Sequence, residues 1–450
     1  MREKRTVQCS IFEQYAEHEI GQELKAMSDW LDEHLDLLEW VAADIKQRNV
    51  EETGRPGLTV ESVLRCAILK QYRQLSYEEL EFCLLDSSSC QTFARLTQGW
   101  LPKKATLHSC ISAISDVTWE EINQRLLHSA CQAKVEKGEM LRIDSTVTDA
   151  PIHAPSDSTL LWDSVRVLVR LLKQAEELAE GITVIDYKNH QRMAKKRMRA
   201  IGYTRGQDKK RPLYRDLIHA TQKSLSYLEA AGICLQAVAA YKPTAVELWL
   251  RQVAHYQPLI AQVIDQTERR VFQGEKVPAT QKIVSLFEEH TDIIVKGSRD
   301  IQYGHKLNLS TGRSGLILDV VIESGNPADA ERFLPMLERH IDHYGRAPRQ
   351  MAADGGYAST ENLHEAKALA VKNVVFHKKR GLKVEEMAKS PWVYRKLRNF
   401  RAGIEAGISC MKRAYGLGRC TWKGLKHFKA YVWSSVVAHN LALFGRLLSP

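Results

Sequence analysis

Two aspartates stand where a carboxylate could hold a divalent cation. Asp144 lies inside the apolar segment 140–147, where a lone carboxylate is costly unless it is paired or bound to a metal ion. Asp354 follows the strand-like segment 350–353 and precedes a Gly-Gly pair that lets the backbone turn sharply. Ligands commonly bind at the carboxyl end of such a strand, so this position favours a functional site.

A third acid, Glu405, lies in a segment with helical periodicity. Arg401, Glu405 and Lys412 share one face of the predicted helix, together with Ile408. The adjacent face is an apolar stripe that we expect to be buried, formed by Ile404, Ile408, Met411 and Tyr415. A glutamate between two cations at the edge of a buried stripe is placed to face a cleft.

Each acid also has an ordinary structural explanation. Asp144 could accept hydrogen bonds from Ser145 or Thr146, and Asp354 could be a turn aspartate. Glu405 could form a surface ion pair worth under about 1 kcal/mol. Other acids near the first strand compete with Asp144 on composition alone, namely Asp149, Asp157 and Asp163.

Positive charge is concentrated in two segments of a chain whose net charge is +10. Residues 188–215 carry 11 basic residues and one acid, and residues 372–429 carry 16 basic residues and three acids. Such blocks are typical of proteins that bind a polyanion, although a solvated surface of unpaired cations is the alternative. Aromatic residues that can stack on bases or sugars lie in or next to both blocks, namely Tyr187, Tyr203, Tyr214, Trp392, Tyr394, Tyr415 and Trp422. Together with the three acids, the blocks favour a carboxylate cluster that holds hard divalent cations beside a phosphodiester.

The overall composition is that of a globular protein, with 44% hydrophobic and 26% charged residues in 450 positions. No stretch approaches the ~20 apolar residues of a membrane helix, and the N-terminus lacks the apolar core of a secretory signal. Nine scattered cysteines, never spaced as Cys-x-x-Cys, argue against a disulfide framework and a structural zinc site. We therefore expect a cytoplasmic protein with reduced thiols and no membrane partner.

The N-terminal part of the chain has the pattern of short helices. Capping signals predict helices that begin at Thr59, Ser76 and Thr118, and Ser76 forms a capping box with Glu79. Breaks are predicted at residues 54–57 and 100–104. Short helices joined by tight turns suit either a helix-turn-helix DNA reader or an ordinary bundle, and the pattern does not separate the two.

The periodicity then changes to that of a mixed sheet. The predicted order is a strand at 140–147, long helices over about 157–287 with a basic loop at 201–206, a hairpin at 303–309 and 316–322, a helix at 328–340, a strand at 350–353, a helix at 360–370, a strand at 373–377, and helices from about 399 onward. This order predicts an α/β fold whose sheet is interrupted after its first strand. We expect an all-helical domain over residues 1–135, which we predict to bind DNA, and a second domain over 136–450 with a helical insertion at about 157–287.

Three motifs together resemble the catalytic signature of bacterial insertion-sequence DDE transposases. They are Asp144-Ser-Thr in a strand, Asp354-Gly-Gly-Tyr-Ala-Ser after a strand, and Arg401-x3-Glu405-x6-Lys412 on a late helix. The fuller signature has a tyrosine three residues before the arginine, where this chain has Arg398.

The resemblance spans nearly the whole chain, and the layout of the chain is most similar to that of the ISNCY type. Tyr303-Gly-His-Lys306 and Asn440-Leu441 also match the group. The segment from Gly57 to about Leu96 resembles an N-terminal domain that is common in it.

The resemblance implies a ribonuclease H-like catalytic core in which Asp144, Asp354 and Glu405 are the catalytic residues. They would bind two Mg²⁺ or Mn²⁺ ions about 3.5–4 Å apart, which activate water or a 3′-OH. The reaction would be hydrolysis at the ends of a mobile element, followed by attack of the freed 3′-OH on target DNA. The implied partners are double-stranded DNA, as terminal inverted repeats and as target, and further copies of the chain in a homo-oligomer on DNA.

Cations beside the acids and in the helical insertion are the predicted DNA contacts. By the resemblance Arg401 and Lys412 hold phosphates beside the metal ions, although they could instead orient Glu405. His305 and Lys306 could also contact DNA, but a histidine that ends a strand is more often structural. In the insertion the predicted DNA-binding residues are Lys195, Lys196, Arg197, Lys209, Lys210 and Arg211.

Two other functions share these features. One is a catalytically inactive or repurposed DNA-binding protein of the same fold, and the intact acidic triad argues against it. The other is a metal-dependent nuclease without strand transfer, which would use the same site. Only an N-terminal domain that recognises element ends argues against this second alternative.

Overall fold

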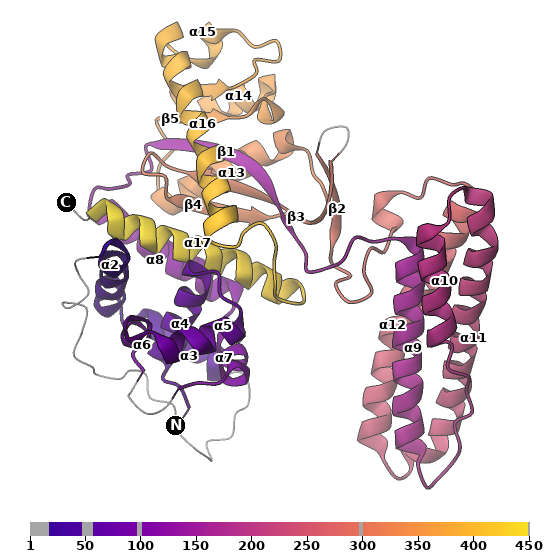
Figure 1. Cartoon of the computed structure of the whole chain (residues 1–450). Coiled ribbons are helices and arrows are strands. Elements are labelled where there is room, and N and C mark those ends of the chain that lie inside the picture. The colour runs from indigo at the N-terminus through magenta and orange to yellow at the C-terminus, as the bar shows by residue number, and fades with distance from the viewer. Residues whose placement is uncertain (1–17, 47–56, 97–100, 297–299, 449–450) are drawn as a thin grey trace. The chain divides into compact units, whose positions relative to one another are not determined.

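The computed structural model describes residues 18–46, 57–96, 101–296 and 300–448 (Figure 1). The chain forms two compact units, one made of Met1–Pro151 and Ile294–Pro450 and the other of Ile152–Ile293. We call the second the helical unit. Within the described ranges, no helix combines the length and apolar character that a membrane crossing requires.

A six-stranded mixed sheet organises the first unit. Its strands are β1 (Met140–Asp149), β2 (Asp292–Lys296), β3 (Asp300–Thr311), β4 (Ile317–Ile322), β5 (Gln350–Ala353) and β6 (Asn373–Phe376). The order is β2-β3-β1-β5-β6, and β4 also pairs with β3. β5 is parallel to both β1 and β6, whereas β3 is antiparallel to β1 and to β4. The α/β class and the mixed sheet are therefore as predicted.

The predicted strands correspond to β1, the β3–β4 hairpin, β5 and β6. β2 was missed, because Asp292-Ile-Ile-Val-Lys is only five residues long and its three apolar residues show no alternation. The late helix also differs from the prediction, since it begins at Pro391 and not near residue 399. The missed start signal is Ser390, whose hydroxyl accepts a hydrogen bond from the Val393 N–H, followed by proline at the first helical position.

Helices surround the sheet and extend the first unit at both ends of the chain. After the hairpin come α13 (Asp329–Tyr344), α14 (Thr360–Ala368), α15 (Val384–Met387), α16 (Pro391–Ala414) and α17 (Leu425–Leu448). The N-terminal helices are α2 (Glu19–Glu33), α3 (Leu37–Lys46), α4 (Val60–Tyr72), α5 (Tyr77–Asp86), α6 (Ser88–Phe93), α7 (Lys104–Ile111) and α8 (Asp116–Gln132). The C-terminal helix α17 packs on α8, α4 and α2, and N-terminal helices share one hydrophobic core with the sheet (Figure 1). A separate domain over residues 1–135 remains a prediction.

The predicted helix starts are right in two of three cases. Thr59 caps α4, and the capping box of Ser76 and Glu79 opens α5. The third start is wrong, because α8 begins at Asp116 and its cap is Ser115, which accepts from the Thr118 N–H. Thr118 is therefore the third residue of the helix. Of the predicted breaks, residues 54–56 and 100 lie outside the described residues.

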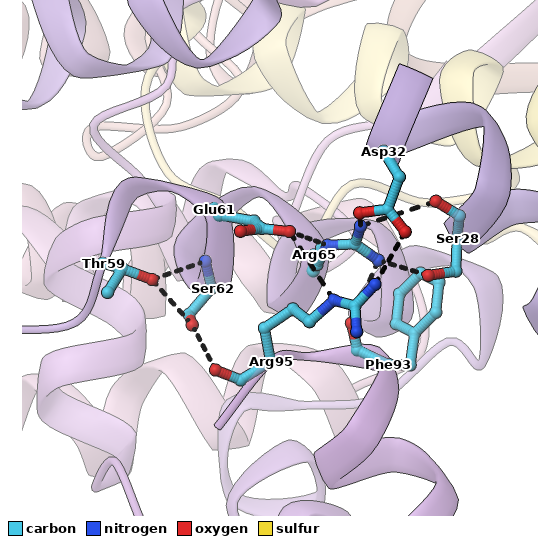
Figure 2. A network of polar contacts seen from close by, with 8 residues as sticks. All are labelled: Ser28, Asp32, Thr59, Glu61, Ser62, Arg65, Phe93 and Arg95. Atoms are coloured by element: carbon cyan, nitrogen blue, oxygen red, sulfur yellow. Dashed lines mark hydrogen bonds and ion pairs between the residues drawn. The ribbon is translucent and has the colours of Figure 1, made fainter. Parts of the chain in front are cut away.

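A buried polar network joins the N-terminal helices to one another (Figure 2). Arg65 on α4 is only 1% exposed and pairs with Glu61 (Nε–Oε1, 2.9 Å) and with Asp32 on α2 (Nη2–Oδ1, 3.0 Å). It also donates to Ser28 Oγ at 2.9 Å, while Arg95 pairs with the second Asp32 oxygen at 2.6 Å. Two arginines thus share two carboxylates, which balances charges that would be costly to bury alone.

The helical unit has its own hydrophobic core. Its helices are α9 (Asp157–Ala179), α10 (Gln191–Tyr203), α11 (Gln207–Ala239) and α12 (Pro243–Val271), which lie between β1 and β2 in the sequence. Trp249 anchors α12, since its Nε1 donates to the Leu171 carbonyl of α9 at 2.8 Å. The predicted loop at 201–206 is shorter than expected, because α10 continues to Tyr203 and Gly206 makes the turn with φ 87°.

Candidate active site

The pairing of β1 with β5 brings two of the predicted acids next to each other, at the carboxyl end of β5. The two strands are parallel, with Ile143 opposite Ala353. Asp144 follows Ile143 and Asp354 follows Ala353, so the two aspartates lie side by side. Asp144 is 14% exposed and Asp354 is 39% exposed, which leaves the pair accessible from solvent.

Glu405 reaches the same place on α16, which packs across β1, β5 and β6. One guanidinium joins all three acids. Arg401 Nη2 lies 2.9 Å from Asp144 Oδ2 and 3.6 Å from Asp354 Oδ1, and Arg401 Nη1 lies 2.5 Å from Glu405 Oε1. The Arg401 side chain is 9% exposed and the Glu405 side chain 60% exposed. The three acids singled out by the sequence therefore lie around a single cation.

The donor set suits a hard divalent cation, because carboxylate oxygens are the ligands that Mg²⁺ and Mn²⁺ prefer. In the parts of the chain that the structure describes, however, no group of three or more His, Cys, Asp or Glu side chains has metal-binding geometry. Arg401 occupies the central position among the carboxylates. A metal ion at this position would therefore require the guanidinium to move aside.

Sequence reasoning missed Arg142, which holds α16 on the sheet. Its Nη1 donates to the Phe400 carbonyl at 2.7 Å, and its Nε donates to Thr311 Oγ1 at 2.6 Å. Gly403 makes this approach possible, since a Cβ there would lie 2.1 Å from Arg142 Nη1. Arg142 is two residues before Asp144, so both belong to the same face of β1. An arginine at this place in an apolar strand was the available signal.

The backbone turns directly after Asp354, as predicted, and the two glycines of the turn also have a packing role. Gly355 and Gly356 do not have positive φ values; they form the 3₁₀ turn η2 (Gly355–Tyr357). They are required for space, because a Cβ on Gly355 would lie 2.6 Å from Lys378 Cβ and one on Gly356 would lie 2.6 Å from Asp329 Oδ2. The two glycines therefore allow the turn after β5 to pack closely against Lys378 and Asp329.

The tyrosine of the same motif is a core residue. Tyr357 is buried, and its hydroxyl donates to Asn308 Oδ1 on β3 at 2.7 Å. Burial raises the pKa of Tyr357 well above its ordinary value, and the negative charges of Asp329 and Asp144 add to the rise. The hydroxyl therefore stays protonated and ties the turn after β5 to β3.

Other residues of the predicted signature have structural contacts. His305 and Lys306 are buried; His305 Nδ1 hydrogen-bonds with the Glu323 carbonyl oxygen at 3.1 Å, and Lys306 pairs with Asp329 at 2.6 Å. Lys412 lines a pocket of about 620 Å³ with Arg419 and Trp422, among others. Arg398, at the position of the expected tyrosine, is exposed.

Asp149 is the acid at the end of β1. Burial raises its pKa, and the positive charges of Lys412 and Arg419 lower it. The other competing acids, Asp157 and Asp163, lie on α9 of the helical unit. They are ion-paired there with Arg270 and Arg166, each at 2.8 Å.

The predicted DNA-binding residues of the helical unit lie on two helices, α10 and the start of α11. Arg197 is ion-paired with Asp216 at 2.9 Å, and Arg211 approaches Asp208 at 3.8 Å. The side chains that are exposed to solvent are Lys195, Lys196, Lys209 and Arg211, while Arg197 and Lys210 are half-buried.

Residues 296–441 match the family model described as a transposase DDE domain. The matched region includes Asp354 and Glu405, whereas Asp144 precedes it. No curated protein and no solved structure matches the chain. Residues 296–441 are therefore similar to a transposase DDE domain, which agrees with the resemblance of the chain to the insertion-sequence DDE transposases.

Proposed function

We propose that the protein cleaves DNA at the ends of a mobile element and joins the freed 3′-OH ends to target DNA. The observation that carries the proposal is the convergence of Asp144, Asp354 and Glu405 on one guanidinium. These acids come from β1, the end of β5 and α16, so three separate elements must be in place to build the site. We assign them as the catalytic residues.

The three carboxylates would hold two Mg²⁺ or Mn²⁺ ions. Bound ions supply Lewis acidity, which activates water or a 3′-OH and stabilises the leaving oxygen. The chain itself supplies rigidity: paired strands fix Asp144 and Asp354, and the anchor formed by Arg142 and Gly403 fixes the helix that carries Glu405.

Arg401 would have a second role once the carboxylates bind cations. Its planar guanidinium can then turn to a DNA phosphate, for which two parallel N–H donors are suited. The same side chain would thus neutralise the acids in the free protein and hold the substrate in the complex.

We further propose that the sheet and its helices form a ribonuclease H-like core within residues 136–450, with the segment 157–287 as a helical insertion. The N-terminal helices within 1–135 would recognise element ends. Support comes from the order of the strands, in which β1 lies between antiparallel β3 and parallel β5. The match to a transposase DDE domain implies DNA as the substrate.

A cleavage and strand-transfer assay tests the proposal. Purified full-length protein and Mg²⁺ would be incubated with labelled DNA that carries the element's own terminal repeat. We expect nicks at the repeat boundary and joined products. Asp144→Asn and Glu405→Gln should each lower the rate at least about 100-fold while retaining DNA binding, since metal ligands contribute several kcal/mol.

Glu331→Gln on α13 is the matched control, because Glu331 is an exposed acid of the same unit outside the site. It should cleave like the wild type. Repeat binding without cleavage by the wild type would support the non-catalytic alternative. Cleavage without joined products would support the nuclease.

A further inference from the structure

The helical unit contains a basic pocket that is not part of the candidate active site. Its volume is about 530 Å³, and it opens to solvent. We call it the basic pocket, and its lining residues are Pro155, Ser156, Asp157, Gln207, Lys210, Tyr214, Arg270, Val271, Gly274, Glu275, Lys276 and Lys282.

Three helices and one connecting segment build this pocket. The first turns of α9 and α11 contribute Asp157 and Lys210, and the last turn of α12 contributes Arg270. The segment after α12 closes the pocket with Lys276 and Lys282. Two helix N-termini at one cavity add partial positive charge to that of the side chains.

The acids of the pocket are already neutralised by arginines. Asp157 Oδ1 lies 2.8 Å from Arg270 Nη1, and Glu275 Oε1 lies 2.6 Å from Arg269 Nη2. Three lysines remain, namely Lys210, Lys276 and Lys282. Within the described residues none of the three has a carboxylate at ion-pair distance.

Lys282 lies close enough to Arg270 and Lys276 for their positive charges to act on it. The pKa of Lys282 is lowered by burial first and by the nearby charges of Arg270 and Lys276. The carboxylate of Asp157 offsets only part of this effect, and an anion in the cavity would reduce the remaining repulsion. The ligand of such a site is a polyanion or a phosphate group.

We propose that the basic pocket binds backbone phosphates of double-stranded DNA. This deepens the proposed function and rests on it for the identity of the polyanion, because a transposase DDE domain implies a DNA substrate. The pocket differs from the exposed basic residues of α10, since its lysines converge on one concave site. It adds Arg270, Lys276 and Lys282 to the residues predicted from the sequence.

The test measures DNA binding by the full-length protein without Mg²⁺, so that binding is separated from cleavage. Fluorescence anisotropy with a short duplex would be recorded over a range of salt concentrations. The double variant Lys276→Gln/Lys282→Gln should bind at least about tenfold more weakly. Its plot of log K against log salt should be shallower by about 2, since each phosphate contact contributes about 0.9.

The control is the double variant Lys173→Gln/Lys223→Gln, which removes the same charge from exposed positions on α9 and α11. It should retain most of the affinity and a slope within about 0.5 of the wild type. Thermal unfolding of both variants would verify that the helical unit is intact. Equal affinity and equal slope for the two variants would overturn the proposal.

Two further measurements are added. One distinguishes DNA from a small phosphate ligand, and the other distinguishes failure of the pocket proposal from failure of the catalytic proposal. In one outcome, inorganic phosphate or a mononucleotide binds the wild type but not the variant Lys276→Gln/Lys282→Gln, and this variant still binds DNA like the control. The pocket would then bind a small phosphate ligand, and its assignment to DNA would be wrong. Cleavage with Mg²⁺ is followed in parallel. If the wild type cleaves DNA and the pocket variant binds DNA like the control, only the proposal for the pocket is wrong. If binding depends on the pocket lysines but the wild type does not cleave, only the catalytic proposal is wrong.

Discussion

At the scale of single residues, Arg401 is the centre of the candidate site. Three carboxylates at one site repel one another, and burial of Asp144 strengthens that repulsion. Arg401 is one of the few side chains whose geometry allows it to bind several carboxylates at once, because its donors are spread around a planar fork. A lysine at this position would offer only a single nitrogen.

Arg401→Gln should make the metal-free protein less stable by about 1–3 kcal/mol, because the three acids lose their shared cation. This is below the 3–5 kcal/mol typical of a broken buried pair, since Asp354 and Glu405 are partly exposed. Millimolar Mg²⁺ should raise the melting temperature of the variant more than that of the wild type. Differential scanning fluorimetry with EDTA or Mg²⁺ measures both effects.

Arg339→Gln serves as the control for Arg401→Gln. Arg339 also binds two carboxylates, Asp319 on β4 at 2.5 Å and Glu120 on α8 at 2.9 Å, but neither belongs to the candidate site. Its removal should destabilise the protein without increasing the response to Mg²⁺. An equal Mg²⁺ response in the two variants would contradict the metal assignment.

Two buried histidines make stability depend on pH. Burial lowers the pKa of His340 and of His439 to about 4, whereas an unfolded histidine titrates near 6.5. The unfolded state therefore binds more protons between these values, and stability falls as the pH drops below about 6.5. We expect a loss of about 2 kcal/mol for each histidine between pH 7 and pH 5.

Urea unfolding at several pH values checks this effect of the histidines. His439→Gln should lower stability at pH 7 but make the loss toward pH 5 smaller. His128→Gln, which changes an exposed histidine on α8, should leave the pH dependence as it is in the wild type. If all three proteins lose the same free energy between pH 7 and pH 5, the buried histidines do not cause the dependence.

At the scale of elements, Asn440 joins the C-terminal helix to a strand and to the N-terminal helices. Its Oδ1 accepts from the Ile317 N–H at 2.9 Å, and its Nδ2 donates to the Ile317 carbonyl and to Asn123 Oδ1, each at 2.7 Å. Ile317 is the first residue of β4, and Asn123 is on α8. A side chain of the motif that resembles the transposase group therefore ties three elements together in this protein.

Asn440→Ala should cost about 2–4 kcal/mol, because the buried polar groups of Ile317 and Asn123 lose their partner. Asn123→Ala should cost less, about 1 kcal/mol, since both hydrogen bonds between Asn440 and Ile317 remain. Chemical denaturation of the full-length variants measures the two losses. Equal losses would mean that Asn440 does not form the junction.

At the scale of the whole molecule, the helical unit has a core of its own. We expect residues 152–293 to fold when expressed alone, with helical circular dichroism and cooperative unfolding in urea. A fragment that begins at residue 191 should stay unfolded, because α9 supplies Leu160, Leu161, Val165, Leu168 and Leu172 to that core. Non-cooperative unfolding of the longer fragment would show that the unit depends on the rest of the chain.

The sequence by itself determined what local interactions control. Alternation of side chains identified β1 and the β3–β4 hairpin, and capping residues placed the starts of α4 and α5. The same local contexts singled out Asp144, Asp354 and Glu405, since an acid in an apolar strand or after a strand end is visible in a few residues. The third predicted helix start was wrong, because Ser115 and not Thr118 caps α8.

Only the tertiary structure decided how these residues act together. Asp144 and Arg401 are 257 residues apart, and no spacing in the sequence states that they are ion partners. The hydrogen bond from Arg142 to the Phe400 carbonyl and the grouping of Lys276 and Lys282 with Lys210 in the basic pocket were hidden for the same reason. Side-chain periodicity and capping depend on neighbours in the chain, whereas a shared counter-ion or a pocket depends on which elements pack together, and that follows from the whole fold.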